Sequence, residues 1–307
     1  MNPLTHTPSG FVRSLQMSRH NICAFVEGQD CDSFFYDGIC NQALRTEGFS
    51  FKIRRAKELP YQTGGKSSLI QFYKYLRSKQ ELSTKLKGKN TVILFFLDKD
   101  IDDVLRRKCR SPHVIYTKYY DLQNHLFLNA DFLKALAAAT SIEESEIRCA
   151  KLFKNNWCRL AARRWRGWMV LCLLNQKFCT GRANYRLTSQ INRPINGRTD
   201  RYLYRREVEE FGKNLGWSRT IIKSEVSKME KLVDKHFANG SQDHIFKGKW
   251  YCPLIEKDIR DAFRTRQANF SGIANRITSS LAATLDFSEP WATHFTSAIG
   301  AVIREIP

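Results

Sequence analysis

The stretch TVILFFLDKDIDDV, from Thr91 to Val104, decides the fold of the N-terminal part of the chain. It opens with an uninterrupted run of apolar or β-branched residues, which predicts a strand buried on both faces at the centre of a parallel sheet. Where this strand ends, four carboxylates follow: Asp98, Asp100, Asp102 and Asp103. Taken alone, such an acidic cluster is typical of a solvated turn, so its meaning depends on the rest of the sequence.

The composition predicts a globular protein that binds a polyanion. The 307 residues are 42% hydrophobic, enough for a sizeable core and two domains. Lys and Arg number 50 against 30 Asp and Glu, a formal net charge of +20. This imbalance favours nucleic acid, before a membrane surface, as the partner.

The sequence predicts a cytoplasmic protein with reduced thiols. The longest apolar run without a charge, Trp168 to Asn175, is far shorter than the roughly 20 residues of a membrane span. The first residues, MNPLTHTPSGFVRSL, lack the apolar core of a secretory signal. Nine cysteines are scattered without a CxxC pair, which argues against a zinc site or a disulfide framework.

Residues 1–130 alternate between predicted strands and helices, which indicates an α/β domain with a mostly parallel sheet flanked by helices. The predicted strands are Asn21–Val26, Phe49–Arg55, Thr91–Leu97 and a run that begins at His113. One predicted helix follows Asp30, and a second follows the glycine turn at Gly64 and Gly65.

Residues 131–307 are predicted to form a mainly helical, basic region for substrate, partner or dimer contacts. Within it, Thr180–Asp200 is rich in Gly, Asn, Arg and Pro and predicts an exposed loop. A polar helical run follows from Arg205 to Phe237, then a hairpin over Asn239–Cys252, and further helix to the C-terminus.

Three carboxylates are candidates for catalysis: Glu27, Asp98 and Asp100. In a parallel sheet, ligands bind beyond the carboxyl ends of the strands, and the first and third predicted strands deliver these residues there. If these two strands are neighbours, the three carboxylates converge, and like charges packed so closely are costly unless a cation lies between them. Oxygen ligands of this type suit Mg²⁺ or Mn²⁺. Glu27 can serve as a metal ligand or as general base, while Asp102 and Asp103 are expected to be solvated or peripheral.

A strand ending in Glu-Gly, followed about 70 residues later by an apolar strand ending in Asp-x-Asp, resembles the TOPRIM catalytic core. The flanks FVEGQDCDSFFYDGIC, TGGKSSLIQFYKYL, FFLDKDIDD and YTKYYDLQNHLF resemble the OLD-like TOPRIM family that includes the nuclease subunit of the PARIS anti-phage system. The first motif of that family, Glu-Gly-x-x-Asp, is matched by Glu27, Gly28 and Asp30. Its last motif often carries Glu-Asn, where this chain has Gln123 and Asn124.

The resemblance implies a Mg²⁺-dependent endonuclease that acts as a toxic effector in antiviral defence. It implies that a partner ATPase of the ABC type or AAA-like class holds the nuclease and releases it on infection. It further implies tRNA as the substrate, with arrest of translation, and a homodimer as a possible active species.

Three further residues are expected in a second shell around the site: Asp30, Lys66 and Asp121. Asp30 is equally suited to capping the helix that follows it. Lys66 follows the glycine turn and could face a phosphate at a helix start. The segment TGGKSS is no P-loop, because Pro60 stands where that motif requires glycine.

The segment KLFKNNWCRLAARRWRGW, residues 151–168, predicts nucleic-acid contacts through Arg159, Arg163, Arg164 and Arg166 together with Lys66. The alternative for the tryptophans is an amphipathic helix with Trp157, Leu160 and Trp168 in the core. For the arginines, an acidic partner surface is an equal alternative to nucleic acid.

Two rival functions stay open on the sequence. The first is a DNA-directed nuclease of the OLD type, with the same chemistry on a different substrate. The second is a non-catalytic subunit whose acidic cluster only docks a partner.

Overall fold

The computed structural model describes residues 7–28, 31–61, 64–153, 156–178, 200–264, 270 and 272–304. The chain forms two compact units. The first comprises Met1–Lys99, Lys108–Lys118 and Leu281–Pro307, and the second comprises Asp100–Arg107 and Tyr119–Ser280. This division differs from a single cut near residue 130, because the C-terminal segment belongs to the first unit.

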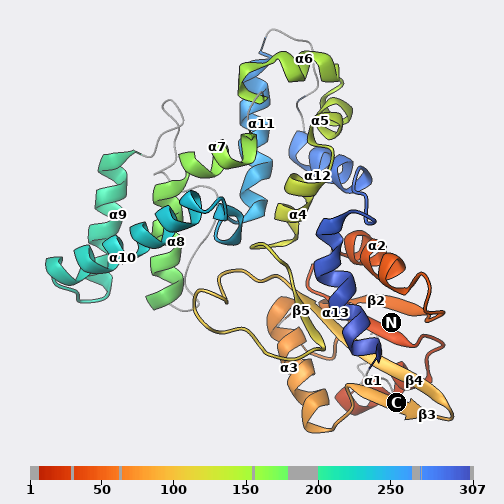
Figure 1. Ribbon diagram of the computed structural model, residues 1–307. Helices are drawn as coiled ribbons and strands as arrows, with labels where there is room; N and C mark the ends of the chain where they lie inside the picture. Colours follow the sequence, from red (N-terminus) through yellow and green to blue (C-terminus); the bar gives the residue numbers. More distant parts are fainter. Residues whose placement is uncertain are drawn as a thin grey trace, which may run out of the picture. The chain divides into compact units, whose positions relative to one another are not determined.

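The first unit is built on a mostly parallel sheet (Figure 1). The described strands are β1 (Ile22–Val26), β2 (Phe51–Arg55), β3 (Ser83–Leu86), β4 (Lys89–Leu97) and β5 (Val114–Tyr116). β1 pairs in parallel with β2 and β4, and β5 pairs in parallel with β4. The predicted mostly parallel sheet is therefore confirmed, and β4 is its central strand because β1, β3 and β5 all pair with it.

Helices cover both faces of this sheet: α1 (Pro8–Met17), α2 (Asp32–Leu44), α3 (Gly65–Ser78) and α13 (Thr293–Arg304). Side chains alternate across a strand, so β4 sends successive residues into two different layers. Phe95 joins the core that α1 and α3 cover, with its ring centroid 6.1 Å from that of Phe72. Phe96 faces the other layer, where it stacks on Tyr36 of α2 at 4.3 Å.

The C-terminal helix α13 packs against α2 in the second of these layers (Figure 1). Its Phe295 is fully buried, with ring centroids 5.7 Å from Phe35 and 6.1 Å from Tyr36. The sequence predicts a helix at this end of the chain. Its place against the N-terminal layer comes only from the structure.

Two glycine turns shape the elements around the sheet. Gly64 and Gly65 have φ values of +66° and +54°, so the predicted glycine entry into α3 is confirmed. The antiparallel strand β3 was not predicted. It joins β4 through Lys87 and Gly88, whose φ values of +50° and +80° are those of a two-residue type I′ hairpin turn.

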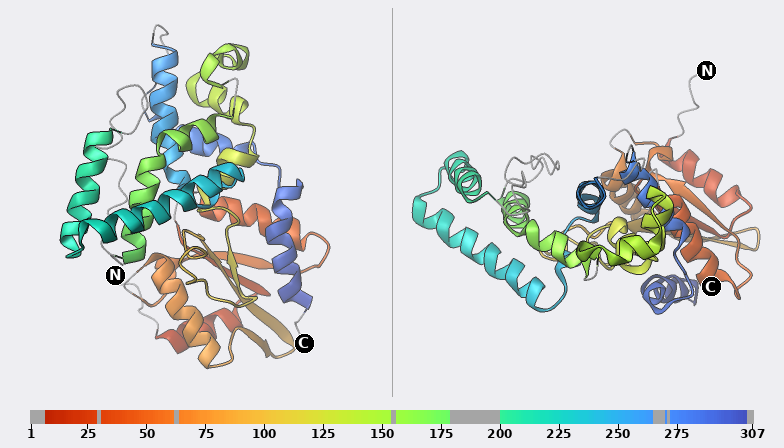
Figure 2. Two further views of the ribbon diagram at one scale, coloured as in Figure 1. Left: turned by 60° about the vertical axis from the view of Figure 1, so that its left-hand side comes forward. Right: turned by 90° about the horizontal axis from the view of Figure 1, so that it is seen from above.

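The second unit is helical, as predicted for the C-terminal region. Its helices are α4 (Leu122–Asn129), α5 (Phe132–Thr140), α6 (Glu144–Cys149), α7 (Trp157–Arg164), α8 (Arg166–Phe178), α9 (Arg201–Asn214), α10 (Arg219–Ala238) and α11 (Tyr251–Ala262). The chain returns to the first unit within α12 (Ile273–Ala283). The predicted helical run from Arg205 is divided by a turn at Gly216 into α9 and α10. α10 packs against α8 and α9 (Figure 2).

The predicted hairpin over Asn239–Cys252 is wrong. This segment forms two short 3₁₀ turns, η4 (Gln242–His244) and η5 (Gly248–Trp250), before α11 begins. The reason is that its polar groups have partners other than a neighbouring strand: the backbone N–H of Gly248 donates to the Asp121 carboxylate at 3.1 Å. The predicted loop Thr180–Asp200 lies outside the described residues except for Asp200, which caps α9.

Among the described residues, no helix combines the length and the apolar composition that crossing a bilayer requires. The described cysteines are all free.

We predict that Phe295→Ala lowers the free energy of unfolding by about 3–5 kcal/mol, because it leaves a cavity between α13 and α2. Urea denaturation followed by tryptophan fluorescence measures the change. Ser297→Ala, at an exposed position of the same helix, is the control and should change stability by no more than about 0.5 kcal/mol. Equal stability of the two variants would contradict the described packing of α13.

Candidate active site

Glu27 and Asp98 meet at the carboxyl edge of the sheet. Glu27 directly follows β1 and Asp98 directly follows β4, and these strands are parallel neighbours with Val26 opposite Phe96. The backbone N–H of Asp98 donates to Glu27 Oε1 at 2.8 Å. The first residue after the central strand is thus tied to the Glu27 carboxylate, which reaches across from the neighbouring strand.

Lys66 comes to the same edge from the first turn of α3. Its Nζ donates to the backbone oxygen of Asp98 at 2.5 Å and lies 5.6 Å from the centre of the Tyr116 ring. The glycine turn at Gly64 and Gly65 allows this approach, because α3 begins directly after it. The structure therefore brings together Glu27, Asp98 and Lys66, which the sequence places on three separate elements.

Asp32 fixes the loop that follows Glu27, a role that the sequence analysis missed. Its Oδ2 accepts the backbone N–H of Gly28 at 2.8 Å. A Cβ at Gly28 would lie 2.6 Å from the Asp32 carboxylate oxygens, so the close approach requires glycine. The sequence signal that could have revealed this role is the carboxylate of Asp32, two positions beyond Asp30. Asp30 itself lies outside the described residues.

The chain passes from the first unit to the second between Lys99 and Asp100. Lys99 is buried, and its Nζ donates to the backbone oxygen of Lys118 at 2.6 Å. Asp100 has a φ of +52°, a left-handed conformation that aspartate tolerates better than most residues. Its backbone N–H donates to the oxygen of Tyr120 at 2.7 Å, within the second unit. Asp103, as expected, is exposed.

Asp121 is a buried helix cap in the second unit. It caps α4 by accepting the backbone N–H of Asn124 at 3.2 Å, and it also accepts the backbone N–H groups of Gly248 and Lys249. Burial raises the pKa of Asp121 to about 6, although the nearby lysines and these hydrogen bonds oppose the shift. The carboxylate therefore holds α4 to the segment that carries η5.

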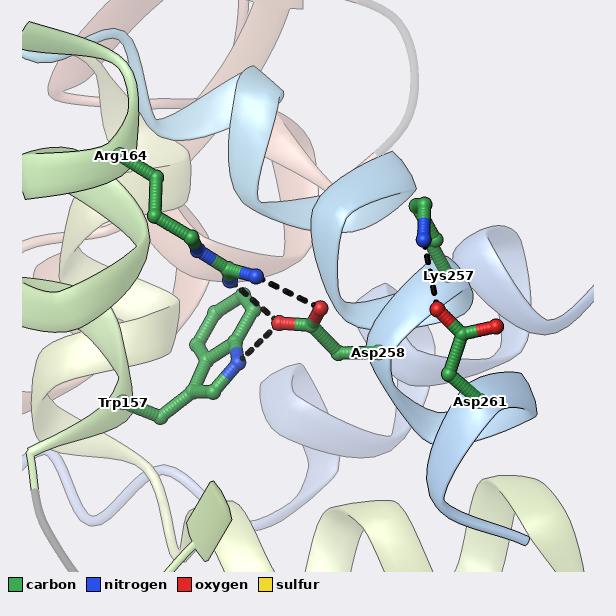
Figure 3. A network of polar contacts seen from close by, with 5 residues as sticks. All are labelled: Trp157, Arg164, Lys257, Asp258 and Asp261. Carbon is green, nitrogen blue, oxygen red and sulfur yellow. Dashed lines mark hydrogen bonds and ion pairs between the residues drawn. The ribbon is translucent and has the colours of Figure 1, made fainter. Parts of the chain in front are cut away.

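Arg164 lies in a network inside the second unit (Figure 3). Its guanidinium makes two hydrogen bonds to the Asp258 carboxylate, one of them 2.8 Å long, and Trp157 Nε1 donates to the same carboxylate at 2.8 Å. The side chain of Asp258 is only 8% exposed. This arginine therefore neutralises a buried acid.

The other predicted arginines differ in whether their guanidinium groups bind a carboxylate. Arg166 makes two hydrogen bonds to Asp234, of 2.6 and 2.7 Å, which raise the pKa of its guanidinium. Arg159 and Arg163 lie on the exposed side of α7, and Arg159 also donates to the backbone oxygen of Phe237 at 3.2 Å. Trp157 is buried as the alternative prediction required, but Leu160, assigned to the core in that alternative, is exposed.

The donor set at the sheet edge suits a hard divalent cation. Within the described ranges, no group of three or more His, Cys, Asp or Glu side chains is gathered as a metal cage. Mg²⁺ is usually held by one or two carboxylates, with waters and substrate phosphates at the remaining positions. Glu27 and Asp98 fit that mode of binding.

No protein-family model matches the sequence, and neither does any curated protein.

We predict that Asp121 makes the parent protein lose stability as the pH rises from about 4 to about 6. Its pKa is higher in the folded chain (about 6) than the ordinary value of 3.8, so the folded state holds the extra proton in this window. Raising the pH removes that proton and costs about 3 kcal/mol. Urea denaturation of the parent and of Asp121→Asn across this range isolates the effect. Parallel pH curves for the two proteins would show that Asp121 titrates normally.

We predict that Arg164→Gln lowers the free energy of unfolding by about 2–3 kcal/mol, because it leaves the buried Asp258 carboxylate without its charged partner. Arg163→Gln is the matched control, one residue away but exposed, and should change stability by no more than about 0.5 kcal/mol. Chemical denaturation of both variants tests this difference. An equally small loss for both would mean that the pair with Asp258 contributes nothing.

Proposed function

We propose that this chain is a Mg²⁺- or Mn²⁺-dependent nuclease with Glu27 and Asp98 at its active site. The observation that carries this proposal is the contact between Glu27 Oε1 and the Asp98 N–H, which fixes the Glu27 carboxylate against the first residue after the neighbouring parallel strand. The formal charge of +20 supports a polyanionic substrate.

Glu27 and Asp98 would hold the cation, with waters and substrate phosphate oxygens at the remaining positions. Asp100, the third carboxylate that the sequence predicts for the site, belongs to the second unit. When bound, such a cation polarises the scissile phosphate and lowers the pKa of a bound water. Glu27 is alternatively the general base that accepts the proton of the attacking water, as the sequence also allows.

Lys66 suits the role of a phosphate ligand beside this pair. Its ammonium group is held at the end of β4 by the oxygen of Asp98, within 5.6 Å of the Tyr116 ring. A lysine ammonium group carries three donors and a full positive charge, which makes it a common ligand of phosphate oxygens. Its positive charge would offset the charge that develops on the phosphate during cleavage.

RNA is the substrate that we favour, and tRNA in particular. The resemblance of the motifs around Glu27 and Asp98 to the OLD-like TOPRIM family supports a toxic effector of antiviral defence that cleaves tRNA after release from a partner ATPase. The same resemblance supports pairing of two copies in the active form. Arg159 and Arg163, exposed on α7, are better suited to contact nucleic acid than Arg164 and Arg166, whose guanidinium groups bind carboxylates.

We predict that Glu27→Gln and Asp98→Asn each lower the rate of RNA cleavage by roughly 10²-fold or more, because each removes a charge from the site. Glu27→Gln keeps an oxygen to accept the Asp98 N–H, so the local structure should persist. Cleavage is followed on purified tRNA with Mg²⁺ by denaturing gel electrophoresis. Asp103→Asn, at an exposed aspartate of the same cluster, is the control and should cleave like the parent.

The same assay separates the rival functions. Intact tRNA beside a nicked plasmid would replace RNA by DNA as the substrate. Cleavage that is unchanged in both Glu27→Gln and Asp98→Asn would refute the metal-nuclease proposal and leave a binding role for the acidic cluster.

A further inference from the structure

The first two turns of α9 expose a tyrosine among arginines. Arg201, Tyr202, Arg205 and Arg206 are all exposed, and together they are called the α9 face below. Tyr202 is 73% exposed, one of the most exposed large hydrophobic residues of the described chain. Tyr202, Arg205 and Arg206 are neighbours on the helix surface, because residues three and four apart lie side by side.

The exposure of Tyr202 does not result from a loose helix. Two positions later, Tyr204 points the other way and its hydroxyl donates to Glu230 of α10 at 3.5 Å. Near the other end of α9, Phe211 packs on Trp217 with ring centroids 5.8 Å apart. The helix is thus anchored along its length, while Tyr202 makes no ring contact within the described residues.

The arginines of the α9 face have no ionic partner within the described part of the chain. Glu209 and Glu210 stand one turn beyond Arg205 and Arg206, but Glu209 lies 3.8 Å from Arg219 instead. Arg201 and Arg205 are four residues apart, a spacing at which like charges repel. Positive charge toward the start of a helix is also unfavourable against its dipole. These arginines therefore do not serve the stability of α9.

We propose that the α9 face binds unpaired bases and adjacent phosphates of the RNA substrate. This inference rests on the proposed function for the choice of RNA. An exposed tyrosine offers a flat ring on which a base can stack, and arginines three and four residues away can contact the phosphates on either side. The site belongs to the second unit, whereas Glu27, Asp98 and Lys66 belong to the first, so docking and chemistry use different residues.

Unpaired RNA fits this face better than duplex. Bases in an RNA helix are stacked on one another, so they cannot cover a side-chain ring, whereas the bases of a loop can be splayed out. Duplex RNA would use the arginines and leave the ring of Tyr202 in water. The tyrosine therefore predicts a preference for loops, and the arginines predict salt dependence.

Binding can be measured without cleavage, by fluorescence anisotropy in EDTA with the full chain. The probes are a fluorescein-labelled RNA stem-loop and a blunt RNA duplex of equal length. We expect Tyr202→Ala to weaken stem-loop binding about 5- to 100-fold with little effect on the duplex, and Tyr202→Phe to bind like the parent. The double variant Arg205→Gln/Arg206→Gln should reduce the slope of log affinity against log salt by about 1.4.

Lys223→Gln/Lys231→Gln is the charge-matched control, because it removes two exposed lysines of α10. It should bind the stem-loop better than the arginine variant does. Equal losses in the two double variants, or parental binding by Tyr202→Ala, would overturn the proposal. Because the anisotropy assay measures binding without cleavage, its failure would leave the cleavage tests of Glu27 and Asp98 unaffected. Failure of those cleavage tests would likewise leave the measured RNA affinities unchanged.

Discussion

The burial of β4 on both faces is the constraint on which the rest of the first unit depends. Its residues from Thr91 to Leu97 are all buried, and β1, β3 and β5 all pair with this strand. A strand of this kind must end where the apolar run ends, and Asp98 is the first residue beyond it. The Asp98 N–H then needs an acceptor outside the sheet ladder, and the Glu27 carboxylate supplies it. The end of β4 is therefore both the edge of the buried core and the position of the candidate site.

The second unit holds its helices together with buried carboxylates. Asp243 accepts hydrogen bonds from Tyr251, Gln242 and Asn124, and burial raises the pKa of its carboxyl group. Asp258 accepts from Trp157 and Arg164 in the same unit. These buried acids therefore tie together segments that are far apart in the sequence.

Local patterns predicted most of the elements, and long-range contacts decided the exceptions. The apolar runs located β1, β4 and the start of α3, because periodicity and glycine turns are local properties. β3 was missed because its residues, STKL, carry no apolar run, and its hairpin depends on the turn at Lys87 and Gly88. The predicted hairpin at Asn239–Cys252 failed because its N–H groups bind Asp121, more than 100 residues earlier in the chain.

The sequence by itself determined the mostly parallel sheet and placed Glu27 and Asp98 at the carboxyl ends of its strands, whereas the structure decided that these two strands are neighbours. Only the tertiary structure decided which charged residues have partners. Arg163 and Arg164 are adjacent and chemically identical, yet only Arg164 binds Asp258, which lies 94 positions away. Likewise Tyr202 is exposed and Tyr204 packs on α10, although no local pattern distinguishes them. Such differences depend on which surface a neighbouring helix covers, and that is settled when the chain is packed.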